Sequence, residues 1–193
     1  MHAIELDPGD YRCSYKLVGG RPSLDLVNTV SWPATERSHD WLDSVANLQR
    51  WLKAVGLTPA KACDLSVAIE LRELLAAVLR PLAHGTTPPR GAIARFDDRI
   101  AEAAAQRRID PATLKWRWKK PADTAASLAP VILDAADLIT AGDRERLRFC
   151  PACDWLFEDQ TRNGRRRWCD MADCGSRDKA RRYYRRTYRR TQQ

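Results

Sequence analysis

The sequence predicts a mainly α protein, with a helical N-terminal domain that includes a short β-hairpin and a small cysteine-rich C-terminal domain. Three observations support this fold class. Apolar residues recur at helical spacing through most of residues 1–143, four of the six cysteines lie between residues 150 and 174, and the net charge of +8 is concentrated in that same C-terminal part. We therefore expect two domains, residues 1–143 and 144–193.

The first domain is expected to contain helices joined by turns. The apolar spacing predicts helices in residues 23–30, 40–55, 58–85, 92–107 and 123–141. Gly56 and Gly142 are stop signals, Thr58-Pro59 is a helix start, and Pro81 is expected to kink or end its helix. Residues 86–89 read as a turn. Ile109, Leu114, Trp116 and Trp118 suggest a short hairpin around Asp110-Pro111.

The C-terminal cysteines have the spacing of a metal site. Cys150 and Cys153 form a C-x2-C pair, and Cys169 and Cys174 form a C-x4-C pair after fifteen intervening residues. Four thiolates in two such pairs suit one tetrahedral Zn²⁺. The sequence therefore predicts a zinc finger with one zinc ion per chain.

The segment between the two pairs indicates how this finger folds. Trp155 to Phe157 is a strand-like run, Asn163-Gly164 is a tight-turn dipeptide, and Arg165 to Trp168 would return as the second strand. The second pair leads into a polar segment that reads as a helix from about Gly175. We interpret this order as a treble-clef-like arrangement.

A redox function is the alternative for these cysteines. The N-terminus lacks the features of a signal peptide and no apolar run is long enough to span a membrane, so we expect a cytoplasmic protein with reduced thiols and no membrane partner. CPAC resembles a thioredoxin-type pair, but that chemistry needs the pair at a helix start within a βαβ unit. Cys13 and Cys63 have no partner spacing and are interpreted as ordinary small buried residues.

The basic charge lies in the cysteine-rich domain. Residues 144–193 hold 15 Lys+Arg and 7 Asp+Glu, whereas residues 1–143 hold 18 of each. On the predicted C-terminal helix, Ala180, Tyr183, Tyr184 and Thr187 form one stripe, which we expect to pack on the zinc hairpin. The other faces of this helix and the expected second strand of the hairpin carry the candidate nucleic-acid contacts. These are Arg165, Arg166, Arg167, Arg177, Lys179, Arg181, Arg182, Arg185, Arg186 and Arg189.

At this point the sequence resembles a known family. RFCPACDWLFEDQTRNGRRRWCDMADCGSRDKARRYYRR is similar to the CGNR-type zinc finger of bacterial regulators. The preceding residues resemble the ABATE domain, a stress-induced transcription regulator, through Val18–Arg21, Leu24–Thr29, the Leu-rich segment 69–79 with Arg72-Glu73, and residues 114–118. Ser176 stands where the finger family has asparagine. Serine can still cap a helix start, but it lacks the amide group of asparagine.

A ligand site in the N-terminal domain has one candidate group, Arg21, Asp25 and Asn28. The alternative for these residues is helix capping and buried hydrogen bonding to the Gly19-Gly20 loop. No enzyme is expected, because His2, His39 and His84 stand in no catalytic spacing and no phosphate-binding or nucleophile motif occurs.

The resemblance implies a zinc-dependent regulator that binds double-stranded DNA, with a helical domain that senses a small-molecule or protein effector or forms a homodimer. An RNA-binding or protein-interaction module stays open, and a thiol oxidoreductase is the remaining class. We expect residues 1–142 to fold alone without binding DNA, so that Cys169→Ser would unfold only the tail.

Overall fold

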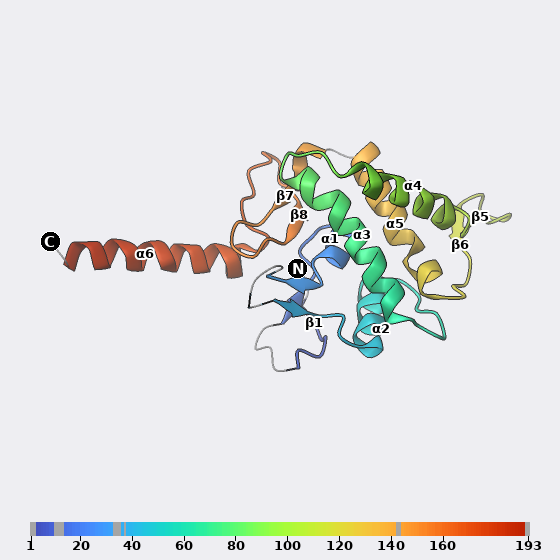
Figure 1. The fold of residues 1–193 in the computed structure, drawn as a ribbon, viewed down its shortest axis with the longest axis horizontal. Coiled ribbons are helices and arrows are strands. Elements are labelled where there is room, and N and C mark those ends of the chain that lie inside the picture. Colours follow the sequence, from blue (N-terminus) through green and yellow to red (C-terminus); the bar gives the residue numbers. More distant parts are fainter. Residues whose placement is uncertain (1–2, 10–13, 33–35, 37, 142–143, 192–193) are drawn as a thin grey trace.

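The fold is built mainly from helices, as the sequence predicts (Figure 1). The computed structural model describes residues 3–9, 14–32, 36, 38–141 and 144–191. Its α-helices are α1 (Pro22–Val27), α2 (Val45–Ala54), α3 (Leu65–Ala83), α4 (Arg90–Ala104), α5 (Thr124–Thr140) and α6 (Ser176–Thr191). Helix α4 packs along α5, and α3 contacts α1, α4 and α5. No helix in the described part of the chain is both long enough and apolar enough to cross a membrane.

Capping side chains decide where two of these helices begin. Ser44 caps α2 and Asp64 caps α3, each accepting a hydrogen bond from a backbone N–H of the first turn. The helices predicted in residues 40–55 and 58–85 therefore begin later than expected, directly after these caps. Pro81 lies inside the last turn of α3, which ends shortly after it.

Short antiparallel strand pairs connect the helices. They are β1 (Ala3–Ile4) with β2 (Tyr15–Lys16), β3 (Val30–Ser31) with β4 (His39–Asp40), β5 (Arg107–Ile109) with β6 (Trp116–Trp118), and β7 (Leu147–Phe149) with β8 (Leu156–Glu158). The β5–β6 hairpin is the one predicted around Asp110-Pro111. The two N-terminal pairs were not predicted, because two-residue strands are too short to show an alternating pattern.

The helical part and the cysteine-rich part share one hydrophobic core. Trp51 and Leu75 from the helices belong to the same buried cluster as Leu147, Leu156 and Phe157 from the C-terminal hairpin. Strand β8 contacts α1, and β7 contacts α3. The C-terminal hairpin is therefore a structural neighbour of the helices rather than a separately packed tail.

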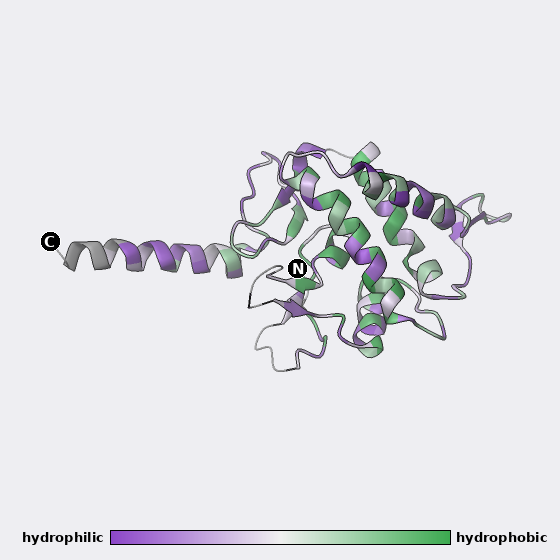
Figure 2. Cartoon of the chain, in the orientation of Figure 1, coloured by the Kyte–Doolittle hydropathy of each residue, from purple (hydrophilic) through white to green (hydrophobic). Residues whose placement is uncertain are grey.

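Helix α6 extends away from this body (Figure 1), and its hydrophilic character stands out in Figure 2. Tyr183 and Tyr184 are 67% and 68% exposed, and α6 packs chiefly against the turn from which it starts. The prediction that the stripe of Ala180, Tyr183, Tyr184 and Thr187 packs on the zinc hairpin is wrong. Leu156 and Phe157 of the hairpin are already fully buried in the common core and are therefore not available to this stripe.

Candidate metal centre and nucleic-acid interface

The first cysteine pair lies in the turn between β7 and β8. Cys150 N–H donates to Trp155 O at 2.8 Å, and Asp154 N–H donates back to Cys150 O at 2.8 Å. Asp154 closes the turn in the left-handed conformation, with φ +62, which aspartate adopts more readily than most residues. The turn thus places the thiols of Cys150 and Cys153 on the same side.

The predicted pairing of residues 155–157 with residues 165–168 is wrong, because β8 pairs with β7 across the first cysteine pair. Asn163-Gly164 does lie in a turn, with Gly164 at φ +60. The returning segment is shaped by side chains instead of a strand ladder. Buried Asp159 accepts hydrogen bonds from the backbone N–H groups of Thr161 at 3.0 Å and Arg166 at 2.7 Å.

The second cysteine pair lies at the start of the C-terminal helix. A wide helical turn, Met171–Gly175, holds Cys174 and runs directly into α6. Asp170 caps this turn by accepting a hydrogen bond from Ala172 N–H at 2.9 Å. Ser176 does not act as the cap, since its hydroxyl donates to Met171 O at 3.3 Å. Two ligands in a hairpin turn and two at a helix start confirm the predicted treble-clef-like finger.

The four sulfur atoms form one compact cluster. Cys169 Sγ lies 3.5 Å from Cys153 Sγ and 3.6 Å from Cys174 Sγ, and the ligand atoms of all four cysteines lie within 4.8 Å of one another. A tetrahedron with Zn–S bonds of about 2.3 Å has sulfur–sulfur edges of about 3.8 Å. All four side chains are buried. The donor set and its size therefore fit one Zn²⁺, as the sequence predicts.

The electrostatics of the cluster also suit a cation. The cysteines are free thiols, separated well beyond the length of a disulfide bond. Hydrogen bonds from the neighbouring thiols lower the pKa of Cys150, while the pKa of Cys153 and of Cys169 is raised because each thiol donates a hydrogen bond to Cys150 and so keeps its proton. A bound zinc ion would ionise such ligands. Arg177 Nη2 donates to Cys174 Sγ at 3.3 Å and would offset part of the thiolate charge.

The finger is fastened to the helical part through α1 and the loop before it. Asn28, fully buried, donates to Leu156 O at 2.8 Å and accepts from Leu156 N–H at 2.7 Å. Glu158 N–H donates to Gly19 O at 2.8 Å. A Cβ atom on Gly19 would lie 2.8 Å from Leu24 Cβ, so glycine is required where this loop meets α1. Residues of the ABATE-like segment, among them Gly19 and Asn28, thus form the surface against which the finger packs.

The candidate ligand group of Arg21, Asp25 and Asn28 is engaged within the protein. Asp25 accepts hydrogen bonds from the N–H groups of Val18 at 3.0 Å and Gly19 at 2.8 Å. Arg21 forms ion pairs with three carboxylates, those of Asp134, Asp137 and Glu158. The structure therefore brings these residues together as the support of the Gly19-Gly20 loop and the finger.

We expect Asp25 to make stability pH-dependent. Burial raises the pKa of Asp25 from 3.8 to about 7, against the opposing effect of the Gly19 and Val18 N–H donors. The folded state then holds a proton that the unfolded state has lost, so this contribution to stability falls as pH rises from about 4 to 7. Asp25→Asn should remove it. The variant should gain roughly 1 kcal/mol relative to wild type between pH 6 and pH 8. Urea unfolding with excess zinc at both pH values tests this, and a pH-independent difference would contradict it.

The predicted nucleic-acid contacts fall into three groups. Those exposed to solvent are Arg165, Arg167, Arg177, Lys179, Arg181, Arg182 and Arg185, although Arg177 also lies beside the cysteine cluster. Arg166 is turned inward, where it donates to the carbonyl groups of Val18 and Cys169 and stacks on Phe157. Arg186 and Arg189 belong to α6, but their side chains are outside those that the structure describes.

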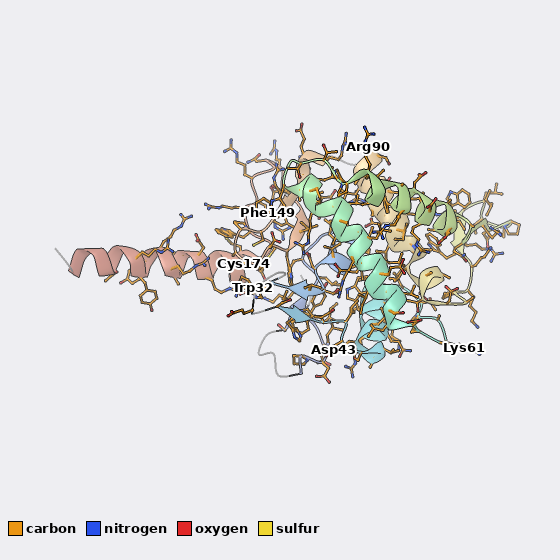
Figure 3. The ribbon with its side chains drawn as sticks, in the orientation of Figure 1. Trp32, Asp43, Lys61, Arg90, Phe149 and Cys174 are labelled. Carbon is orange, nitrogen blue, oxygen red and sulfur yellow. The ribbon has the colours of Figure 1, made fainter. Side chains whose placement is uncertain are left out.

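Several residues that support the metal centre were not singled out from sequence. Lys16 pairs with Asp170 at 3.0 Å, and Arg80 on α3 pairs with Asp154 at 2.6 Å. Trp155 Nε1 donates to Val30 O at 3.1 Å. A small hollow next to the sulfur atoms is lined by Lys16, Trp155 and Asp170, together with Trp32 and Cys174. Figure 3 labels Trp32 and Cys174 beside the start of α6. The sequence did offer one signal for these supporting residues, because Asp154 and Asp170 each directly follow a metal-binding cysteine.

Of the remaining cysteines, the one that the structure describes, Cys63, contributes no ligand to the cluster. Cys63 is half-buried, and its thiol donates to Ala60 O at 3.5 Å. Cys13 lies outside the described residues. The metal centre is thus made by the two predicted pairs.

Comparison with known protein families agrees with this architecture. The profile of the ABATE family, described as "putative stress-induced transcription regulator", matches residues 20–142. The profile of the CGNR zinc finger matches residues 146–187. Neither description is that of an enzyme family. No curated protein matches the chain. The chain therefore belongs to the ABATE family, and its C-terminal part is a CGNR zinc finger.

Proposed function

We propose that this protein is a zinc-dependent transcriptional regulator that contacts double-stranded DNA through α6. The observation that supports this proposal is a basic helix that extends from the zinc centre and packs against little else (Figure 1). Residues 176–191 contain eight Lys or Arg residues and one acidic residue, Asp178. An α-helix fits the major groove of duplex DNA, and arginine can contact both phosphates and guanine.

The zinc centre would fix the direction in which α6 leaves the body. Cys174 lies in the turn that continues into α6, and Cys169 immediately precedes the cap of that turn. A bound zinc ion would join this turn to the hairpin of Cys150 and Cys153. In this proposal the helical part supplies the regulatory input, through an effector or a second copy of the chain.

The α6 contact predicts salt-dependent duplex binding. Arg182 and Arg185 are exposed, and we expect Arg182→Ala, Arg185→Ala to weaken binding to duplex DNA while zinc content stays unchanged. Removal of each phosphate contact should reduce the steepness of the salt dependence by about one unit, because fewer counterions are released. Fluorescence anisotropy at several salt concentrations measures both effects.

Two arginines on α4 provide the matched control. Arg90, at the start of α4 in Figure 3, and Arg95 are exposed on the helical part. Replacing both by alanine removes the same charge and should leave affinity nearly unchanged. Equal losses in the two double variants would indicate a net-charge effect and refute α6 as the contact. Preference for duplex RNA over duplex DNA would favour the RNA-binding alternative.

A further inference from the structure

The β5–β6 hairpin protrudes at the end of the molecule opposite α6 (Figure 1). It exposes large apolar side chains to solvent: Leu114 is 80% exposed and Trp116 is 66% exposed, with Ile109 and Trp118 also exposed. Residues 107–120 carry six Lys or Arg residues and one acidic residue, Asp110. Although the net charge of residues 1–143 as a whole is near zero, this hairpin is locally basic and aromatic.

The strand register gives this hairpin two different faces. Arg107 lies opposite Trp118 and Ile109 lies opposite Trp116, so these four side chains share one face. Arg108 and Arg117 pair on the other face. Two-residue spacing along a strand separates the Cα atoms of Trp116 and Trp118 by about 6.8 Å. The two tryptophans are therefore neighbours on the face that also carries Arg107 and Ile109.

A planar cation already occupies this aromatic face. The guanidinium carbon of Arg107 lies 5.7 Å from the ring centre of Trp116 and 5.1 Å from that of Trp118. Beside Trp118 a cleft of about 460 Å³ is lined by Lys119, Lys120 and the apolar residues Leu57 and Pro130, among others. Its volume is in the range of pockets that hold small organic molecules.

The charges around these rings are available for a polyanion. Among the ion pairs of the described residues, none involves the six Lys or Arg residues of 107–120. Arg108 instead donates to the backbone carbonyl groups of Ala105 and Arg107. The hairpin thus presents positive charge that is outside ion pairs together with solvent-exposed tryptophan side chains, over which Arg107 would have to give way to a base.

From this combination we propose that the β5–β6 hairpin is a binding site for single-stranded nucleic acid. Unpaired bases would stack on Trp116 and Trp118, and the phosphates would lie along Arg107, Lys119 and Lys120. Base stacking on aromatic side chains beside a basic track is how proteins bind single strands without reading sequence. Duplex DNA offers no open base faces to such rings. The site is therefore distinct from the proposed duplex contact on α6.

The test uses full-length, zinc-loaded protein and short oligo(dT) and oligo(U) probes. Trp116→Leu, Trp118→Leu keeps apolar bulk but removes the planar rings, whereas Trp116→Phe, Trp118→Phe keeps rings. We expect the leucine variant to lose roughly tenfold or more in affinity for one or both single strands. The phenylalanine variant should retain most of it. Affinity for duplex DNA should stay unchanged in both variants, which separates this proposal from that for α6.

Zinc content and melting temperature serve as folding controls, because both indoles are exposed. The DNA and RNA probes together show which single strand is preferred. Unchanged single-strand affinity in the leucine variant would overturn the proposal, as would equal losses in the leucine and phenylalanine variants. Binding to phosphatidylglycerol vesicles that depends on these tryptophans, without an effect on single strands, would instead assign the hairpin to a membrane surface.

Discussion

Cys169→Ser is expected to destabilise the whole chain, with α1 to α5 losing structure in the same transition as the finger. Zinc binding contributes about 10–16 kcal/mol of apparent free energy in zinc-finger peptides, as much as the total stability of a typical domain. The cysteines, Leu156 and Phe157 lie in one buried cluster with the helical residues, so releasing the finger would expose the shared core. Thermal unfolding followed by far-ultraviolet circular dichroism should show a single, strongly lowered transition.

Cys63→Ser is the matched control, because Cys63 is half-buried and lies outside the sulfur cluster. It should retain a full zinc content and nearly the wild-type melting temperature. Removing zinc from the wild type with a chelator should reproduce the Cys169→Ser result. A Cys169→Ser protein whose helical signal melts at the wild-type temperature would contradict the shared core. It would support the expectation from sequence that residues 1–142 fold alone.

The sequence was most informative where the chemistry is local. Ligand spacing identified Cys150, Cys153, Cys169 and Cys174, since two pairs around one hairpin suffice to define a zinc site without knowledge of tertiary contacts. Helical periodicity located α1 to α5 for a similar reason, because the spacing of apolar residues reports directly on a buried face. Within these helical segments the starts of α2 and α3 were misjudged, because their caps, Ser44 and Asp64, compete with other polar residues nearby.

What the sequence could not show are the contacts between distant segments. The pairing of β8 with β7 instead of residues 165–168 depends on how Asp159 holds the returning loop. The exposure of the α6 stripe likewise reflects tertiary packing, since Leu156 and Phe157 are already buried in the common core and α6 contacts chiefly the turn before it. Amphipathicity indicated a packing stripe on α6, but such a stripe does not identify its partner. Tyr183 and Tyr184 therefore remain exposed.

Asn28→Ala is expected to weaken the attachment of the finger to the helical part. The side chain satisfies both backbone groups of Leu156 in a fully buried position. Alanine would leave one N–H and one C=O without these partners, at a cost of roughly 2–5 kcal/mol for two buried groups. Urea unfolding measures this loss. Zinc release to a coloured chelator should also become faster, because the finger would separate more often from α1.

Asn47 offers a closely matched control for this experiment. It is also fully buried, and it binds the backbone of Asp7 in the same way, accepting from Asp7 N–H at 2.9 Å and donating to Asp7 O at 3.0 Å. Asn47→Ala should therefore lower stability without a comparable acceleration of zinc release, since its contacts lie within the N-terminal part. If both variants released zinc equally fast at equal stability, Asn28 would stabilise the common core without a specific effect on the metal centre. The coupling of the N-terminal part to the metal centre would then have to act through other contacts, such as those of Trp155 with Val30 and of Glu158 with Gly19.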